Sequence, residues 1–538
     1  MATAEAGTTW AGSNLDGEPA LGAGGPAPEP VPEPVLATGE IQGNVLPGFA
    51  TRFQAFLFVE LLDPGGARDW LRSLPVTTLR DVLTLGPPVG TSPTPAWTNV
   101  ALSHRGLLKI TRDADRMMDM PFKQGLARRS ALLGDPPSEA ADGNCRNWVV
   151  GAPGQPGLDA VLIVGSDERR CLDAAVDALR RGLPPGVEIV MVQPGEDRQA
   201  PFVKHEPFGF RDDISQPGVR GRLSQAHDGF LTPRMNPADP HQGRPGQNLI
   251  WPGEFVFGYP GQDPLDKHRP GPVTGGGPPW TRDGSLLVVR RLRQDVDGFH
   301  RFLRGAAEEL SSRHPALAGL TPEQLGAKLM GRWPSGAPLA KAPDADRPGL
   351  GEDPHANNDF AFAAPTPGAS TAGASSARAS TAGGSAGDPL GLFCPRAAHI
   401  RRAYPRGAAT AGLTAANIET HRMIRRSIAF GAGAGDGPAA ERGIVFLAYQ
   451  TSIERQFEFV TRAWLNNPHL HDTDDGHDPI AGQPFGAHGN RARTFTIPVR
   501  TQDGAVERVP LAIPFEWVVP TGGGYFFAPS AGMLQGLA

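Results

Sequence analysis

The chain has 538 residues, 39% hydrophobic and 20% charged, so it is long enough and apolar enough to bury a sizeable core. Its formal net charge is −5 and no block of lysine and arginine stands out, which argues against a nucleic-acid-binding protein. No apolar run approaches the length of a membrane span. Three cysteines without CxxC spacing, and an N-terminus without the basic and apolar regions of a secretory signal, predict a cytoplasmic protein.

Two stretches have low complexity. Residues 1–40 are rich in Gly, Ala, Pro and Glu, a composition that buries too little apolar surface to offset the entropy of ordering. We therefore predict a disordered tail there. Residues 366–388 contain the sequence ASTAG twice and predict a flexible insertion.

The first half of the chain, residues 41–235, predicts alternating strands and helices. A helix is expected around residues 67–74, and another after Ser166, which we expect to be its N-cap, ending at Gly182. Strands are expected at residues 54–62, 98–103, 159–166 and 187–193. The order β-α-β-β-α-β is that of a ferredoxin-like unit.

The second half, residues 236–538, repeats the pattern. A helix from about residue 295 to 310 follows a strand, and a capping box of Thr451 and Glu454 is expected to open a helix that runs to about Leu465. Strands are expected at residues 285–293, 443–450, 515–519 and 524–529. The predicted fold class is therefore α+β, with two ferredoxin-like halves of antiparallel sheet and peripheral helices.

Three segments carry the residue types of a catalytic site. A loop at 205–221 contains Asp212, a stretch at 393–408 contains His399 and several arginines, and a segment at 421–433 contains Arg425. Taken singly, each has an ordinary explanation: an Asp in a turn, a surface histidine, and arginines on a wet helix face. The segments become informative when they are read together.

Together these segments resemble the dye-decolourising peroxidase family. Gly209 to Asp213 resembles the family motif G-x-x-D-G, CPRAAHIRRAYPR resembles its proximal-histidine segment, and MIRRSIAFG resembles the segment with its distal arginine. Further similarity lies in GEIQGNVLPGF, in GIVFLAYQTSIERQFEFV and in PTGGGYFFAPS. Six segments in the family's order cover the chain from about residue 39 to 538.

The resemblance implies the dimeric α+β barrel type of fold and one haem b per chain, bound in the second half. His399 would be the axial ligand of the iron, with Glu516 as the acidic partner of its other ring nitrogen. Arg406 would bind a haem propionate. Asp212 would move a proton between the two oxygens of hydrogen peroxide, and Arg425 would stabilise the negative charge on the departing oxygen.

The activity implied is that of a peroxidase, which reduces hydrogen peroxide and oxidises dyes or other organic electron donors through a ferryl intermediate. No nucleic acid or membrane partner is expected, and a homo-oligomer is compatible with the family. One of the four tyrosines or Trp251 could relay electrons to the surface, although core packing is the role that we favour for each of them.

The sequence also departs from the family. Asp213 replaces the last glycine of the motif, Ser427 stands where some relatives have asparagine, and Tyr404 occupies another asparagine position. These departures leave open a haem protein with weak peroxidase activity that acts as a haem carrier or peroxide sensor. A metal-binding module in HLHDTDDGHD, residues 469–478, and a purely structural oligomer are further alternatives.

Overall fold

The computed structural model describes residues 32–85, 96–226, 229–363, 387–407, 412–431, 441–470, 474–484 and 491–537. Most of the predicted tail, residues 1–31, and of the predicted insertion, residues 366–386, lies outside the described residues. Residues 33–40 do not fit the predicted tail, because Glu33 forms an ion pair with Arg220 at 3.1 Å and Leu36 is 3% exposed. These contacts attach the segment to the fold.

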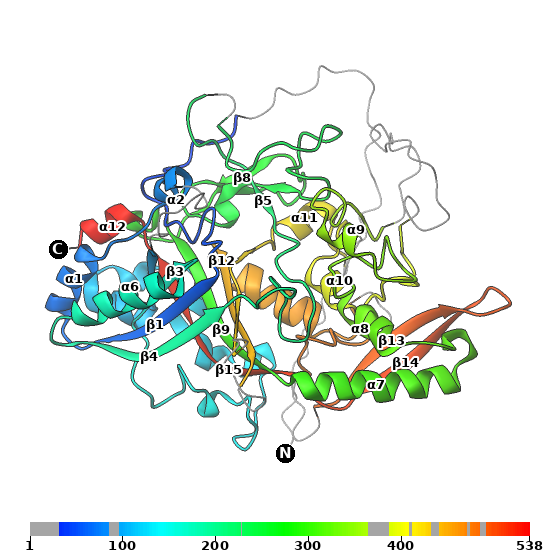
Figure 1. Cartoon of the computed structure of the whole chain (residues 1–538). Helices are drawn as coiled ribbons and strands as arrows, with labels where there is room; N and C mark the ends of the chain where they lie inside the picture. The colour runs from blue at the N-terminus through cyan, green and yellow to red at the C-terminus, as the bar shows by residue number, and fades with distance from the viewer. Residues whose placement is uncertain are drawn as a thin grey trace, which may run out of the picture. The chain divides into compact units, whose positions relative to one another are not determined.

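The first half forms a ferredoxin-like unit (Figure 1). Its four strands are all antiparallel, in the order β2-β3-β1-β4, and helices α1 and α6 connect or flank them. The strands are β1 (Phe53–Leu61), β2 (Trp97–Leu102), β3 (Ala160–Ser166) and β4 (Val187–Glu196). The helices are α1 (Pro64–Ser73), α2 (Leu79–Leu85), α3 (His104–Ile110), α4 (Met120–Gln124), α5 (Leu126–Arg129) and α6 (Arg169–Arg181).

The second half repeats this topology in the order β10-β12-β9-β15. The two halves join where Phe527 of β15 pairs with Leu102 of β2, so that nine strands of the described chain form one sheet. The strands of this half are β9 (Ser285–Gln294), β10 (Ile424–Arg425), β11 (Ile428–Phe430), β12 (Gly443–Gln450) and β15 (Val518–Ala528). Short strands β5 (Gly218–Val219), β6 (Leu249–Ile250), β7 (Pro260–Gln262) and β8 (Pro270–Val273) lie between the halves in sequence.

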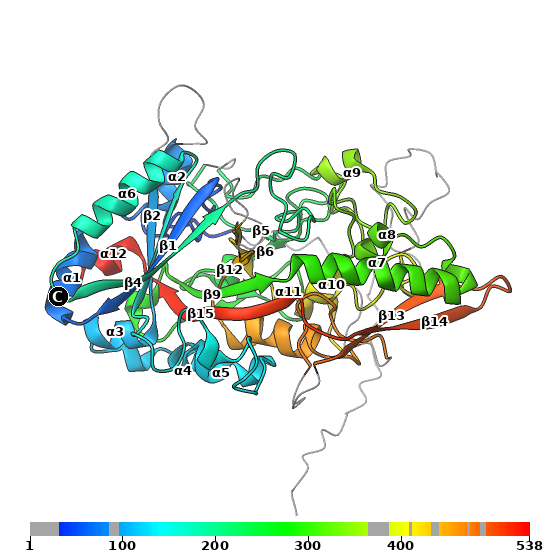
Figure 2. The same cartoon turned by 60° about the horizontal axis from the view of Figure 1, so that its bottom comes forward.

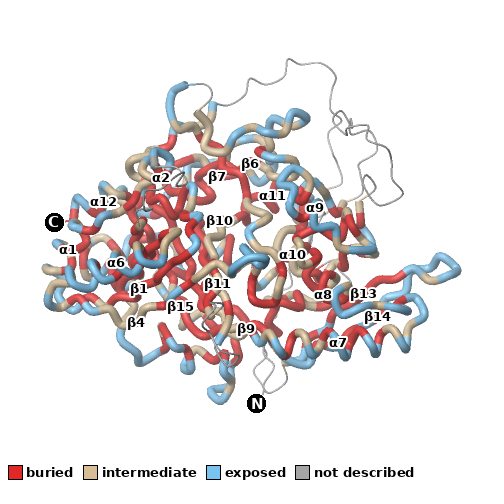
Figure 3. Tube along the Cα trace, viewed as in Figure 1, coloured by how far each residue is buried: buried red, intermediate tan, exposed pale blue. Residues whose placement is uncertain are grey.

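Both faces of the sheet are buried (Figure 3). Residues of β1 alternate between two apolar clusters, with Leu57 in the cluster under the helices and Phe56 and Phe58 in the other. Strand β4, at one end of the strand order, contacts β11 at the other end, where Gly195 leaves no room for a Cβ beside Ile428. The sheet therefore curves back toward itself, as a barrel does.

A second layer extends the second half. Helix α7 (Val296–Arg313) packs over the hairpin of β13 (Arg493–Arg500) and β14 (Val506–Ile513), as Figures 1 and 2 show. The remaining helices are α8 (Pro322–Met330), α9 (Pro348–Glu352), α10 (His399–Ala403), α11 (Ala415–Glu419) and α12 (Ala531–Gln535). Within the described residues no helix combines the length and apolar character that crossing a bilayer requires.

The structure corrects three local predictions. Helix α6 has Glu168 as its N-cap, because Ser166 still belongs to β3. Thr451 does not cap the next helix: its hydroxyl donates to the carbonyl of Gly253, and the segment 454–465 is π-helical. The predicted strands 515–519 and 524–529 are largely one strand, β15, whose register shifts between Pro520 and Gly522.

The predicted boundary between residues 235 and 236 does not separate two compact bodies. Strands β5 and β6 pair across it, and residues Glu33–Ala538 form a single compact unit. The two ferredoxin-like repeats are thus halves of one sheet and share its core.

Candidate active site

The loop that carries Asp212 is a tight hairpin organised by a buried carboxylate. The backbone amide of Asp212 donates to the carbonyl of Lys204 at 2.8 Å. Inside the hairpin, Glu206 accepts hydrogen bonds from the amides of Phe208 and Phe210, both at 2.9 Å, and from the side chain of Gln294 at 2.7 Å. Burial raises the pKa of Glu206 to about 7. Glu206, which the sequence analysis did not single out, therefore shapes the turn that presents Asp212.

Asp213 occupies a position that suits glycine. Its φ is +59°, in the left-handed region, which Asp tolerates better than most residues. Its amide donates to Oδ1 of Asp212 at 2.7 Å, and its own carboxylate accepts from Gln216 at 2.9 Å. Asp213 thus adopts a backbone conformation that suits glycine, and two hydrogen bonds hold it there.

Gln216 joins this loop to the strand that carries Arg425. Its amide oxygen accepts from the backbone N–H of Arg425 at 3.2 Å, and its amide nitrogen donates to the carbonyl of Arg425 at 3.1 Å. The guanidinium of Arg425 donates to the carbonyl of Ser215 at 3.0 Å. Gln216 and Arg425, 209 positions apart in sequence, are thereby held together, and this brings the loop of Asp212 to the strand of Arg425.

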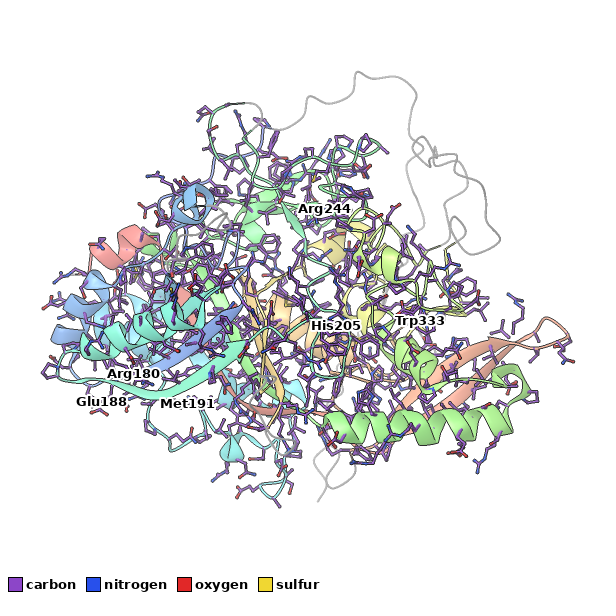
Figure 4. The ribbon with its side chains drawn as sticks, in the orientation of Figure 1. Arg180, Glu188, Met191, His205, Arg244 and Trp333 are labelled. Atoms are coloured by element: carbon purple, nitrogen blue, oxygen red, sulfur yellow. The ribbon has the colours of Figure 1, made fainter. Side chains whose placement is uncertain are left out.

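Asp212 and Arg425 both line a cavity of about 410 Å³. Its wall combines the 205–217 loop, strand β11 and residues 46–51, and His205 and Arg244, labelled in Figure 4, also belong to it. The side chains of Asp212 and Arg425 are partly exposed. A cavity of this size, whose wall carries Asp212 and Arg425 among other charged side chains, can admit a small polar molecule.

His399 begins helix α10, and one of its ring nitrogens is held by a buried acid. Nδ1 lies 2.8 Å from Oδ2 of Asp478, whose side chain is fully buried. Burial disfavours the charge on both groups, but their mutual attraction and hydrogen bond outweigh it, raising the pKa of His399 and lowering that of Asp478. The amides of Ile480 and Ala481 donate to the other carboxylate oxygen, each at 2.8 Å.

This geometry corrects the prediction for Glu516. Glu516 accepts a hydrogen bond from Nε of Arg491 at 2.9 Å, and His399 takes Asp478 instead. The prediction counted back from the last strand without gaps. The acid, Asp478, comes instead from the loop that follows the π-helical segment. This loop lies against α10, because Arg402 donates to the carbonyl of Asn467 at 2.8 Å.

Arg406 belongs to a pair of buried guanidiniums with no carboxylate partner among the described residues. Arg406 donates to the side chain of Asn358 at 2.7 Å and to Ser215 at 3.0 Å, while its Nε is buried without a partner. Arg332 donates to the same Asn358 oxygen at 2.7 Å. Burial lowers the pKa of Arg406 to about 10, and burial and the charge of Arg406 lower that of Arg332.

These residues fit a haem. Nε2 of His399 has no hydrogen-bond partner in the described part of the chain, and a quarter of the side chain is open, as an axial ligand requires. Two uncompensated guanidiniums are costly to bury unless an anion joins them, and propionates are such anions. Arg332 was missed from the sequence because nothing local distinguishes it from any other arginine.

The segment 469–478 does not form a metal site in the described residues. These contain no group of three His, Cys, Asp or Glu side chains that could hold a metal ion, while residues 471–473 lie outside the description. Its acids have other partners: Asp475 binds Arg508 at 2.5 Å and Asp478 binds His399.

Comparison with known proteins points to the family that the sequence resembles. Residues 40–199 match the DyP dimeric alpha+beta barrel domain. Peroxidase 2 of Mycetinis scorodonius is 31% identical to this chain, over 92% of the chain and 86% of its own length. The dye-decolorizing peroxidase AauDyP1 of Auricularia auricula-judae is 30% identical, over 93% and 87%.

Solved structures agree. An ancestral D-type dye-decolorizing peroxidase is 29% identical with a TM-score of 0.72, covering 93% of this chain and 99% of its own. A fungal DyP-type peroxidase from Auricularia auricula-judae is 27% identical with a TM-score of 0.69, covering 93% and 98%. The chain belongs to the dye-decolourising peroxidase family. It is a haem peroxidase that oxidises dyes and other organic donors, as the resemblance implied.

Proposed function

We propose that this chain binds one haem b with His399 as the axial ligand of iron, Asp212 and Arg425 as the catalytic residues, and Arg406 as a propionate partner assisted by Arg332. The observation that carries the proposal is the open Nε2 of His399, whose Nδ1 is fixed by Asp478 at 2.8 Å. An acceptor at Nδ1 selects the tautomer that leaves Nε2 free to bind a metal.

When bound, the haem supplies an iron that receives the peroxide and the electrons drawn from the organic donor. Asp212 takes the proton from one peroxide oxygen and returns it to the other, so that the leaving oxygen departs as water. Arg425 places a fixed positive charge where negative charge develops as the O–O bond breaks. Its hydrogen bond to Ser215 holds the guanidinium in place beforehand.

The overall balance is simple. Peroxide takes up two electrons and two protons and yields two waters, and two molecules of an organic donor each lose one electron. The absence of disulfide pairing among Cys145, Cys171 and Cys394 supports a reducing compartment, so we place this activity in the cytoplasm. A homo-oligomer stays a prediction, and sedimentation velocity would measure the oligomeric state.

The test is a spectrum of the purified, haem-loaded protein before and after one equivalent of hydrogen peroxide. We expect one haem b per chain by pyridine haemochrome, a strong ferric Soret band, and a peroxide-dependent change that a dye reverses. His399→Ala should lose or shift the Soret band. Glu516→Gln is a control in a partly buried carboxylate that does not contact His399, and it should retain the wild-type haem content and spectrum.

The alternatives give different results. Stoichiometric haem with no peroxide-dependent turnover would favour a haem carrier or peroxide sensor. The loss of turnover would then be attributed to Asp213 or Ser427, where the sequence departs from the family. A wild-type protein that binds no haem, or a His399→Ala variant with an unchanged spectrum, would contradict the proposal.

A further inference from the structure

A second cavity, of about 550 Å³, lies in the second half of the chain, and none of its lining residues lines the cavity beside Asp212. Its walls come from the segment 316–320, helix α8, residues 339–344, the segment before α10, and strand β13. Trp333, labelled in Figure 4, is part of it and lies near α8. Neither the peroxide chemistry nor the haem residues account for this cavity.

The cavity wall combines an apolar part, which includes two aromatic side chains, with a polar part of similar extent. Trp333 is 3% exposed, and its indole N–H donates to the carbonyl of Ala342 at 2.7 Å, so the ring is fixed with its polar edge satisfied. Leu317, Leu339 and Phe393 complete the apolar surface. Such a wall suits the flat body of an aromatic molecule, because rings pack well against rings and aliphatic side chains.

Lys328 of α8 brings a positive charge into this apolar wall. Within the part of the chain that the structure describes, its ammonium has no hydrogen-bond or ion-pair partner. It is half-buried, and burial lowers the pKa of Lys328. The nearby carboxylates of Asp388 and Asp344 partly offset the effect of burial, without a hydrogen bond to the ammonium. An ammonium that has lost much of its water and has no bonded anion is stabilised when an anionic ligand joins it. Arg500, at the exposed rim, adds a second cation, against one carboxylate, that of Asp344.

The cavity is also linked to the haem-binding segment. Its wall residues Leu392 and Phe393 are held by Asp388, whose carboxylate accepts from their amides at 2.8 and 3.2 Å. The same stretch of chain reaches His399 six residues after Phe393. Gly331 directly follows α8, and Ile400 belongs to α10. A Cβ on Gly331 would meet Ile400 at 2.4 Å, so the two helices are in close contact.

We propose that this cavity binds a small aromatic anion, a carboxylate or sulfonate, as an electron donor, with Lys328 as its charge partner and Trp333 as part of its apolar wall. The donor role rests on the proposed peroxidase function. Each bound donor gives up one electron to the haem site and leaves as a radical, and two such events supply the two electrons that one peroxide consumes.

Binding is tested separately from turnover, by calorimetric titration of the haem-loaded protein with naphthalene-2-sulfonate. We expect Lys328→Gln to weaken binding about tenfold, because a charge-assisted contact is lost. Arg500→Gln should weaken it about twofold, since that cation lies at the rim. Lys267→Gln, in an exposed lysine outside the cavity, is the matched control and should bind as wild type does.

A neutral ligand of the same shape separates charge recognition from damage to the cavity. 2-Naphthol should bind Lys328→Gln and wild type equally well. Sulfonate binding that is unchanged in Lys328→Gln, or a loss of 2-naphthol binding of the same size, would overturn the proposal.

Steady-state kinetics then tests the donor role. In Lys328→Gln the KM for a sulfonated donor should rise about tenfold, while kcat and the KM for peroxide stay near wild type. An unchanged KM for the sulfonated donor in a variant that has lost sulfonate binding would refute the donor role. A wild-type protein that binds the sulfonate but has no peroxidase activity would instead contradict the proposed function and leave the binding site standing.

Discussion

The two sides of the proposed haem site are built differently. On the His399 side, the carboxylate of Asp478 is fully buried and accepts bonds from His399 and from the amides of Ile480 and Ala481. On the Asp212 side, the proposed catalytic groups Asp212 and Arg425 are partly exposed and line a cavity of about 410 Å³. One side is closed and saturated with hydrogen bonds, and the other is open.

The difference follows from what each side must do. A metal ligand keeps one position throughout turnover. The acid that holds it can therefore have all its oxygens in hydrogen bonds without loss of function. A proton-transferring carboxylate must meet an incoming molecule, so its shell has to leave space, and its position is set by backbone bonds around it. Gln216 and Glu206 provide these bonds on the open side.

The largest effect is expected on the open side. Asp212→Asn removes the proton acceptor while keeping the shape, so the bimolecular rate with peroxide should fall by about 10²–10⁴. Stopped-flow absorbance measures that rate. Haem content should stay as in wild type, because Asp212 is not a ligand, and a rate within threefold of wild type would assign proton transfer to another group.

The closed side should respond through haem rather than through peroxide. Asp478→Asn removes the charge that raises the pKa of His399, and altered partners of metal-bound histidines typically cost about 10–100-fold in metal affinity or activity. The rate of haem transfer to apomyoglobin measures the affinity for haem. The reduction potential of the haem iron should also rise. Glu516→Gln is the control, and equal effects of the two substitutions would contradict the assignment of Asp478.

A smaller effect is expected where the two segments of the open side are joined. Gln216→Ala removes two hydrogen bonds to the backbone of Arg425, each worth about 0.5–1.5 kcal/mol. If the bonds position Arg425, the rate with peroxide should fall by about tenfold with haem content unchanged. Asn236→Ala, in an amide side chain whose contacts lie within its own loop, should leave the rate unaltered.

The last prediction concerns pH, and its effect falls on folding stability rather than on the rate with peroxide. The carboxyl of Glu206 has a pKa of about 7 in the folded chain against 4.5 ordinarily, so the folded state binds more protons between these values. Its contribution to stability is complete below pH 4.5 and is lost as pH rises through about 7, by at most ~3 kcal/mol. In Glu206→Gln this part of the pH dependence should vanish from the melting temperature between pH 5 and 8. Parallel curves for variant and wild type would contradict the raised pKa.

Strand prediction succeeded where burial dominates. Residues 54–62, 159–166 and 443–450 are continuous apolar runs, and each became a strand within a residue or two. Helix starts were less secure. The Thr451 and Glu454 pattern matched a capping box, yet the amide of Arg455 donates to the hydroxyl of Ser452, and Gln456 accepts from the amides of Thr451 and Ser452. Local patterns cannot anticipate such competition from other side chains.

The candidate site divides in the same way. The sequence by itself indicated the repeated ferredoxin-like pattern, and its resemblance to the family supplied the roles proposed for Asp212, His399 and Arg425, because both follow from short segments whose residue types and order can be read along the chain. Only the tertiary structure decided that Asp478 contacts His399, that Arg332 joins Arg406, and that Lys328 lines a second cavity without a hydrogen-bonded partner among the described residues. The physical reason is that hydrogen bonding and burial of charge depend on partners brought from distant segments, and chain folding alone selects those partners.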